Sequence, residues 1–244
     1  MCRHEAAEAL AAIGDPGCLG VLRRYRDREG EETVVRETCE ISVARIEWLE
    51  SEEGMKEKLR QRYLKCKMVG KGSANMDSDF ASIDPAPPME KADSIEDLEK
   101  TLLNTKVPLF LRYRAMFGLR DLASPPDLPT AVPAVLALAK GLSDPSALFR
   151  HEIAFVFGQL SHPASIPALT ASLANLEEVS MVRHEAAEAL GSLGEEEGVE
   201  EVLKRFLHDK EQVVRESVEV ALDMAEFEKG GELEYALIPE VNAA

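Results

Sequence analysis

The sequence predicts an all-α protein built as a solenoid of stacked helical hairpins. The first observation is a motif, Arg-His-Glu-Ala-Ala-Glu-Ala-Leu, which stands at residues 3–10 and again, letter for letter, at 183–190. The second is a shorter period, because the Arg-His-Glu of 150–152 precedes that of 183–185 by 33 residues. The third is composition: Ala, Leu and Glu dominate these stretches, and turn residues such as Asp144-Pro145 separate them. Repeats of this length indicate stacked units that share one core.

Each unit is expected to be a pair of helices, as in HEAT-like repeats. Isolated helices of this length are marginal in water, so each must bury its apolar stripe against its neighbours. An arginine near the start of the second helix marks every unit. The markers are Arg3 and Arg36 in the first half, and Arg112, Arg150, Arg183 and Arg215 in the second.

The organisation follows from these units. Residues 1–50 are interpreted as two repeats remaining from an N-terminal half, and 94–229 as a C-terminal half of four repeats. Ser, Asn, Pro and Gly cluster within 51–93 and large aliphatic residues thin out, which predicts a flexible linker. Residues 230–244 are expected to be an irregular tail. If both halves arose by one duplication, two units should precede Met1, so we expect the chain to be N-terminally truncated.

Composition restricts the partners. The 244 residues carry 28 Lys and Arg against 45 Asp and Glu, a formal net charge of -17, without the basic clusters that a nucleic acid requires. No run of eighteen apolar residues occurs, which argues against a membrane span. Four cysteines without Cys-x-x-Cys spacing, and no leader, predict a cytoplasmic protein. A cationic partner suits the charge best.

Histidine–glutamate pairs occur at one repeat position, near the start of the second helix: His4-Glu5, His151-Glu152 and His184-Glu185. Stacking should align them along one surface, so that side chains of the last two units converge on one point. Imidazoles with carboxylates are the ligands of an open-coordinated non-haem iron. A second cluster would combine His4-Glu5 with a counterpart preceding Met1.

Some of these residues also have less specific interpretations. A single His in an Ala-rich repeat helix is ordinarily a surface residue, whereas three in register favour a site. The preceding arginines are interpreted as architectural, because units without His-Glu carry them too. His162 and His208 fall in predicted turns and are expected to be solvated. The absence of G-x-S-x-G, of a P-loop, of G-x-G-x-x-G and of H-E-x-x-H argues against a hydrolase, a nucleotide fold and a zincin.

Taken together, residues 3–10, 111–117, 148–160 and 213–224 resemble the deoxyhypusine hydroxylase family, and the resemblance covers nearly everything except the linker. It implies a HEAT-repeat di-iron monooxygenase. The implied reaction uses O2 to hydroxylate the deoxyhypusine side chain of a translation factor precursor, which completes hypusine formation. Neither a nucleic acid nor a membrane is implied as a partner.

The resemblance also implies the site residues. The family uses four His-Glu pairs, two from each half, to hold Fe(2+), two ions per complete site. By position, the first N-terminal pair has no counterpart here, so the second iron is expected to be held less tightly. Glu152 and Glu185 are the expected catalytic carboxylates, one of which would hold the substrate amine. The implied metal ligands are His4, Glu5, His151, Glu152, His184 and Glu185.

Alternatives from other classes stay open on the sequence. One is a non-catalytic HEAT-repeat scaffold with an acidic protein-binding surface, and another is an incomplete, weakly active hydroxylase. A bilin-lyase-like HEAT protein shares the Ala-rich helices, but it has no reason to keep His-Glu pairs in register. Iron content separates these classes, because a scaffold should purify without metal.

Overall fold

A computed structural model describes residues 2–56, 59, 83–89 and 94–230, and the regular elements of this part of the chain are helices. The predicted all-α solenoid is therefore confirmed. None of the described helices combines the length and apolarity needed to cross a membrane. The helices are α1 (Cys2–Ile13), α2 (Leu19–Arg26), α3 (Thr33–Glu50), α5 (Ile95–Leu103), α6 (Leu109–Ala123), α7 (Ala131–Lys140), α8 (Ala147–Leu160), α9 (Ile166–Ala174), α10 (Ser180–Gly191), α11 (Val199–Lys204) and α12 (Gln212–Gly230), with short 3-10 turns at Pro16–Cys18, Gly141–Ser143 and Pro163–Ser165.

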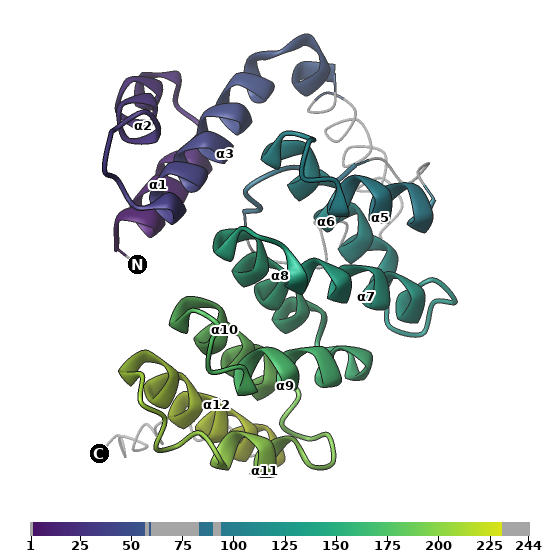
Figure 1. The fold of residues 1–244 in the computed structure, drawn as a ribbon. Coiled ribbons are helices and arrows are strands. Elements are labelled where there is room, and N and C mark those ends of the chain that lie inside the picture. Colours follow the sequence, from purple (N-terminus) through teal and green to yellow (C-terminus); the bar gives the residue numbers. More distant parts are fainter. Residues whose placement is uncertain (1, 57–58, 60–82, 90–93, 231–244) are drawn as a thin grey trace, which may run out of the picture.

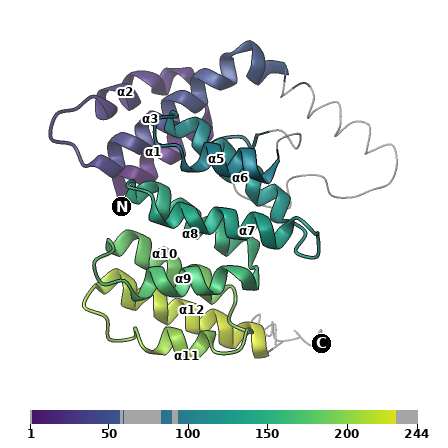
Figure 2. The same ribbon diagram turned by 45° about the vertical axis from the view of Figure 1, so that its right-hand side comes forward.

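The helices stack as pairs from one end of the molecule to the other (Figure 1). Helix α2 packs on α3, α5 on α6, α9 on α10 and α11 on α12, while α8, α10 and α12 follow one another in a row. Helix α1 packs on α3 without an outer helix of its own before it among the described residues. Helix α3 also contacts α6 and α8, so it joins the two halves; the turned view shows the same order (Figure 2).

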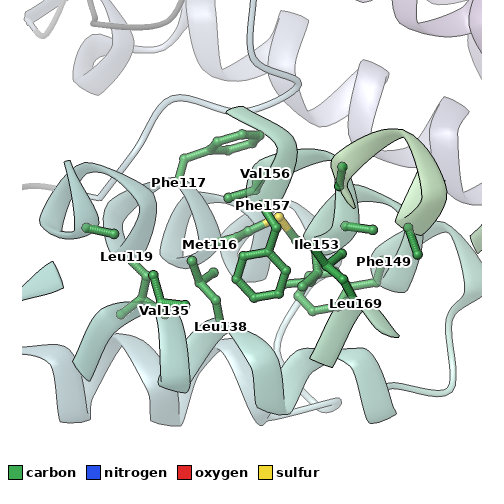
Figure 3. Close-up of a cluster of buried hydrophobic side chains, with 14 of the residues drawn as sticks. Met116, Phe117, Leu119, Val135, Leu138, Phe149, Ile153, Val156, Phe157 and Leu169 are labelled. Carbon is green, nitrogen blue, oxygen red and sulfur yellow. The ribbon is translucent and has the colours of Figure 1, made fainter. Parts of the chain in front are cut away.

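One apolar core runs through the C-terminal half and reaches into α3. Met116, Phe117, Phe149 and Phe157 are fully buried within it and interlock between α6, α7 and α8 (Figure 3). Ile41 of α3 belongs to the same core, whereas the rest of the N-terminal helices share a small separate cluster. The joint between the halves is therefore apolar packing on α3, which holds α1 in place beside α8.

Close approach of the second helices depends on small residues. A Cβ added to Gly191 at the end of α10 would lie 2.8 Å from the Cβ of Ala221 on α12. Carbon atoms do not approach this closely, so this crossing requires glycine. The Gly-x-Leu that ends the repeat helix thus serves packing.

The arginines before the histidines are architectural, as predicted. Arg183 is fully buried, donates to the carbonyl oxygen of Leu173 and forms a bidentate ion pair with Asp209, which precedes the next repeat helix. Arg112 makes the corresponding pair with Asp144. Each arginine thus ties one unit to the next and fixes the rotation of its helix, including the histidine that follows. The other such links are Arg150 with Glu178 and Arg3 with Glu31.

Part of the predicted linker packs against the halves that it connects. Within the 83–89 segment Ala86 is fully buried, and the backbone N–H of Met89 donates to the carbonyl oxygen of Arg114 on α6. Arg114 in turn donates through Nε to the carbonyl oxygen of Pro87, at 3.3 Å. Residues 57–58, 60–82 and 90–93, and 231–244 of the predicted tail, lie outside the described residues.

The expectation that His162 is solvated was wrong. Its side chain is buried, and Nδ1 accepts a hydrogen bond from the backbone N–H of Ala164 within the 3-10 turn before α9. The histidine therefore caps a turn, a role that Asp15 fills in the first half. His208 is exposed, as predicted.

Candidate metal centre

Three repeat helices bring their histidines to one place. His4 lies in the first turn of α1, His151 in α8 and His184 in α10, and the last two stand four residues after the first residue of their helices. The ring centroids of His4 and His151 are 5.8 Å apart, and those of His151 and His184 5.6 Å. In both ribbon views the N-terminal end of α1 lies beside α8 and α10. The three histidine rings therefore lie next to one another as one continuous group of imidazoles.

The start of α8 explains why His151 points into this group. Ser146 caps the helix, because its Oγ accepts a hydrogen bond from the backbone N–H of Phe149. The same hydroxyl donates to the Glu37 carboxylate of α3 at 2.7 Å. One side chain thus sets where α8 begins and ties that beginning to the N-terminal half.

His4 is held as one tautomer by α3. Its Nδ1 lies 3.1 Å from Thr38 Oγ1, and this hydroxyl donates its own proton to the carbonyl oxygen of Val34. Since the hydroxyl proton is used there, Thr38 accepts the hydrogen bond and Nδ1 carries the imidazole proton. Nε2 then has a free lone pair and is buried without a hydrogen-bond donor; Glu5 Oε1 lies 3.3 Å away but is itself only an acceptor. A metal ion would supply that partner.

His184 reaches the same tautomer by another route. Its Nδ1 lies 3.2 Å from Glu188 Oε1, one turn further along α10, and Ser217 of α12 donates to the same oxygen at 2.7 Å. A carboxylate only accepts, so Nδ1 carries the proton and Nε2 is bare. This Nε2 is also buried without a partner. Carboxylates in this position ordinarily orient a metal-bound imidazole.

His151 lies between the other two rings. Its Nε2 is 3.2 Å from Glu185 Oε2 of α10, and its Nδ1 is buried without a hydrogen-bond partner. The ligand atoms of His151, His184 and Glu185 lie within 4.8 Å of one another, close enough for one ion. This trio combines two imidazoles with one carboxylate, a ligand set that leaves coordination positions open.

A second group of three lies on α1 alone. Ligand atoms of His4, Glu5 and Glu8 are also within 4.8 Å of one another. His4 is buried, whereas Glu5 is exposed and Glu8 half-buried. One imidazole and two partly exposed carboxylates make a more open group than the trio on α8 and α10. Glu152 belongs to neither group, although it is buried and lines the same cavity.

Burial and crowding of carboxylates shape the titration of the site. Burial, with a smaller contribution from the neighbouring His151, lowers the pKa of His4 to about 4, so its imidazole is neutral at pH 7. Burial, and then the charges of Glu5 and Glu185, raise the pKa of Glu8 to about 7. The same burial, with Glu8 and Glu185, raises the pKa of Glu152 well above its ordinary value. Neutral imidazoles among mutually repelling carboxylates favour a bound cation.

A cavity of about 570 Å³ opens beside these groups. Helices α1, α3, α8 and α10 form its walls, and the 83–89 segment contributes Ile83, Asp84 and Pro85. The cavity is large enough for an extended side chain of a partner, whose charged end would lie beside five glutamates. These are Glu5, Glu8, Glu152, Glu185 and Glu188.

Two carboxylates of the centre were missed in the sequence. Glu188 is partly exposed, yet it accepts a hydrogen bond from His184. Glu8 occupies the same place in the first copy of the motif, 3.4 Å from His4 Nδ1. Their signal was the fixed spacing of four residues after each histidine, which puts both side chains on one face of a helix.

Comparisons with known proteins agree with this architecture. The family description "HEAT repeats" matches residues 132–223, and "PBS lyase HEAT-like repeat" matches residues 3–26. A deoxyhypusine hydroxylase of Neurospora crassa is 71% identical over 244 residues, covering 99% of this chain and 70% of the relative. One of Chaetomium globosum is 68% identical over 98% of this chain and 66% of its own length.

A solved structure gives the same result. The structure of human deoxyhypusine hydroxylase in complex with glycerol has a TM-score of 0.73 and 43% sequence identity. The match covers 92% of this chain and 67% of the human one, so the chain spans about two thirds of the length of such relatives. With its repeats, its paired histidines and this degree of identity, the chain belongs to the deoxyhypusine hydroxylase family.

Proposed function

We propose that this chain is an iron-dependent monooxygenase that hydroxylates the deoxyhypusine side chain of a translation factor precursor, with O2 as the oxidant. The observation that carries the proposal is the set of buried imidazole nitrogens without hydrogen-bond partners, next to carboxylates, at the wall of a cavity. An orphaned buried polar atom is costly unless a ligand satisfies it. Membership of the family supplies the reaction.

The donor set fits Fe(2+). His151, His184 and Glu185 would hold one ion, and His4, Glu5 and Glu8 are proposed to hold a second ion less tightly. Ferrous iron bound there would supply the reduction of O2 that hydroxylation of an unactivated carbon requires. The resemblance also implies Glu152 as a metal ligand, but we assign this residue to the substrate because it lies in neither group of three.

The residues of the cavity would bind and orient the substrate. Deoxyhypusine carries cationic nitrogens separated by methylene groups, which suits a cavity lined by five glutamates. Glu152 is buried and its pKa is raised, so an ammonium group beside it would restore its ionised form and be held in turn. Phe155, one turn further along α8, would exclude water from the methylene groups of the substrate side chain. Glu185, 3.2 Å from His151, is the second proposed catalytic carboxylate because it joins metal and substrate sites.

A direct experiment tests the proposal. The purified chain is loaded with Fe(2+) without oxygen, mixed with a deoxyhypusine-bearing substrate protein and a reductant, and then exposed to O2. Mass spectrometry should detect one added oxygen atom on the modified lysine. His184→Ala should abolish the gain, whereas His208→Ala, which changes an exposed histidine, should leave it unchanged. A metal-loaded chain that adds no oxygen would refute the proposed activity.

A non-catalytic scaffold is not favoured. A protein that binds partners only through an acidic face gains nothing from burying three imidazoles with unsatisfied nitrogens, and each such atom lowers stability. We also propose that the protein acts in the cytoplasm, which suits a translation factor as its substrate.

A further inference from the structure

The 83–89 segment is anchored to both halves through Asp84. The guanidinium of Arg120 on α6 is 1% exposed and pairs with both carboxylate oxygens of Asp84, at 2.7 and 2.8 Å. Arg45 of α3 donates to the Asp84 carbonyl oxygen at 2.8 Å. A bidentate pair with a buried arginine fixes both the position and the orientation of a carboxylate. The backbone around Asp84 is therefore held in place.

This anchor lies at the end of the cavity opposite the histidines. Along α1, the lining residues run from Glu5 near His4 to Ala12, seven residues or about 10 Å away. Arg45, which holds Asp84, also donates to the carbonyl oxygen of Ala11 at 3.0 Å. Asp84 thus stands beside the C-terminal end of α1, whereas His4 stands at its beginning.

Along this direction the glutamates give way to apolar side chains and to Arg45 and Asp84, whose carboxylate is paired with Arg120. Carboxylates gather beside the histidines, whereas Ile41, Ala12, Phe155, Ile83 and Pro85 line the cavity beyond them. Ile83 is 64% exposed although it lines the cavity, which places its side chain at the mouth. An exposed isoleucine held by an adjacent anchored residue is positioned to contact whatever enters.

We propose that Ile83 and Pro85 form a wall that contacts the methylene chain of the substrate side chain, and that Asp84 is the residue that positions this wall. The inference rests on the proposed function and extends it to a specificity-determining surface outside the repeats. A diamine side chain needs carboxylates for its nitrogens and apolar surface for the methylene groups between them, and the cavity offers these in that order.

The test compares Ile83→Ser with Leu136→Ser in the full chain. Leu136 is 52% exposed on α7 and does not line the cavity, so it is a matched control. Ile83→Ser should raise the KM for the deoxyhypusine-bearing protein about five- to tenfold, because partial burial of a few methyl groups is lost. Its kcat and its iron content should stay unchanged, and Leu136→Ser should change none of the three.

Asp84→Asn tests the anchor. It should raise KM in the same direction with unchanged iron content, and a thermal unfolding curve shows whether the variant folds. If it does not fold, Ile83→Ser decides alone. An unchanged KM in Ile83→Ser, with the unaltered chain active, would overturn the inference and leave the proposed function standing. If the unaltered chain is inactive, the proposed function fails instead. The inference is then tested by the affinity of the metal-free chain for a deoxyhypusine-bearing peptide, and equal affinities of Ile83→Ser and the unaltered chain would overturn it.

Discussion

Glu188 provides a sharp test of how the protein prepares a histidine for metal binding. Its Oε1 accepts hydrogen bonds from His184 at 3.2 Å and from Ser217 at 2.7 Å. The bond from His184 lowers the pKa of Glu188, so the group is ionised at neutral pH. In Glu188→Gln the amide oxygen can still accept both bonds, but it carries no charge.

The magnitude follows from that difference. A hydrogen bond to an ionised group contributes about 1.5–3 kcal/mol, against about 1 kcal/mol for a neutral pair. Losing the charge should therefore weaken metal binding at His184 by about 0.5–2 kcal/mol, or about two- to thirtyfold. Ser217→Ala removes one bond to the carboxylate and should cost about fivefold or less. The double variant should lose less than the product, because both changes act through one oxygen.

Anaerobic titration of the metal-free chain with Fe(2+) or Co(2+) measures these affinities. Glu219→Gln, which neutralises an exposed carboxylate on α12, is the control for net charge. Equal losses in Glu188→Gln and Glu219→Gln would mean that only overall charge matters. Unchanged affinity in Glu188→Gln would refute the idea that this carboxylate orients the imidazole.

Three further predictions address stability and substrate binding. Asp209→Asn should lower the free energy of unfolding by about 3 kcal/mol at pH 7, because buried Arg183 loses its countercharge. Arg183 lowers the pKa of Asp209 in the folded protein, so this stabilisation is present above the unfolded pKa of about 4 and is lost as pH falls through the folded pKa. Urea unfolding of both proteins at several pH values measures this, and a difference in stability that does not change with pH would contradict it. Gly191→Ala should lower the free energy of unfolding by about 1–3 kcal/mol. Gly20→Ala on α2 should not lower it, because a Cβ there meets nothing within 4 Å; thermal unfolding compares the two variants. Glu152→Gln should keep its iron content while kcat/KM falls about tenfold or more, and a loss of iron instead would make it a metal ligand.

The repeats made the fold predictable from the sequence. Identical motifs at residues 3–10 and 183–190 must form the same helix, and the spacing of the marker arginines gave the units. The 83–89 segment was not predictable in this way, because three prolines and few aliphatic residues indicate a linker. What orders it is non-local: its carboxylate and carbonyl groups meet buried arginines of α3 and α6. Prolines with fixed φ also lose little entropy on ordering.

The histidines of the centre were predictable, but their partners were only partly so. Register along the stack indicated which histidines would meet, whereas the hydrogen bonds that choose a tautomer depend on neighbouring helices. Ser217 lies 33 residues beyond His184, and Thr38 lies 34 beyond His4, so the two hydroxyls occupy nearly the same place in the repeat. Comparing the two copies at this position would have indicated both of them.

The two copies of the motif reach one chemical result by different hydrogen bonds. Thr38 donates its hydroxyl proton to the carbonyl oxygen of Val34 and accepts a hydrogen bond directly from His4. Ser217 instead donates to Glu188, and it is Glu188 that accepts the hydrogen bond from His184. In both copies Nδ1 carries the proton and Nε2 is left bare and buried. The shared feature of the duplicated halves is thus the exposed lone pair rather than the residue that produces it. A metal site explains this agreement, because two differently arranged networks have no packing reason to free the same nitrogen.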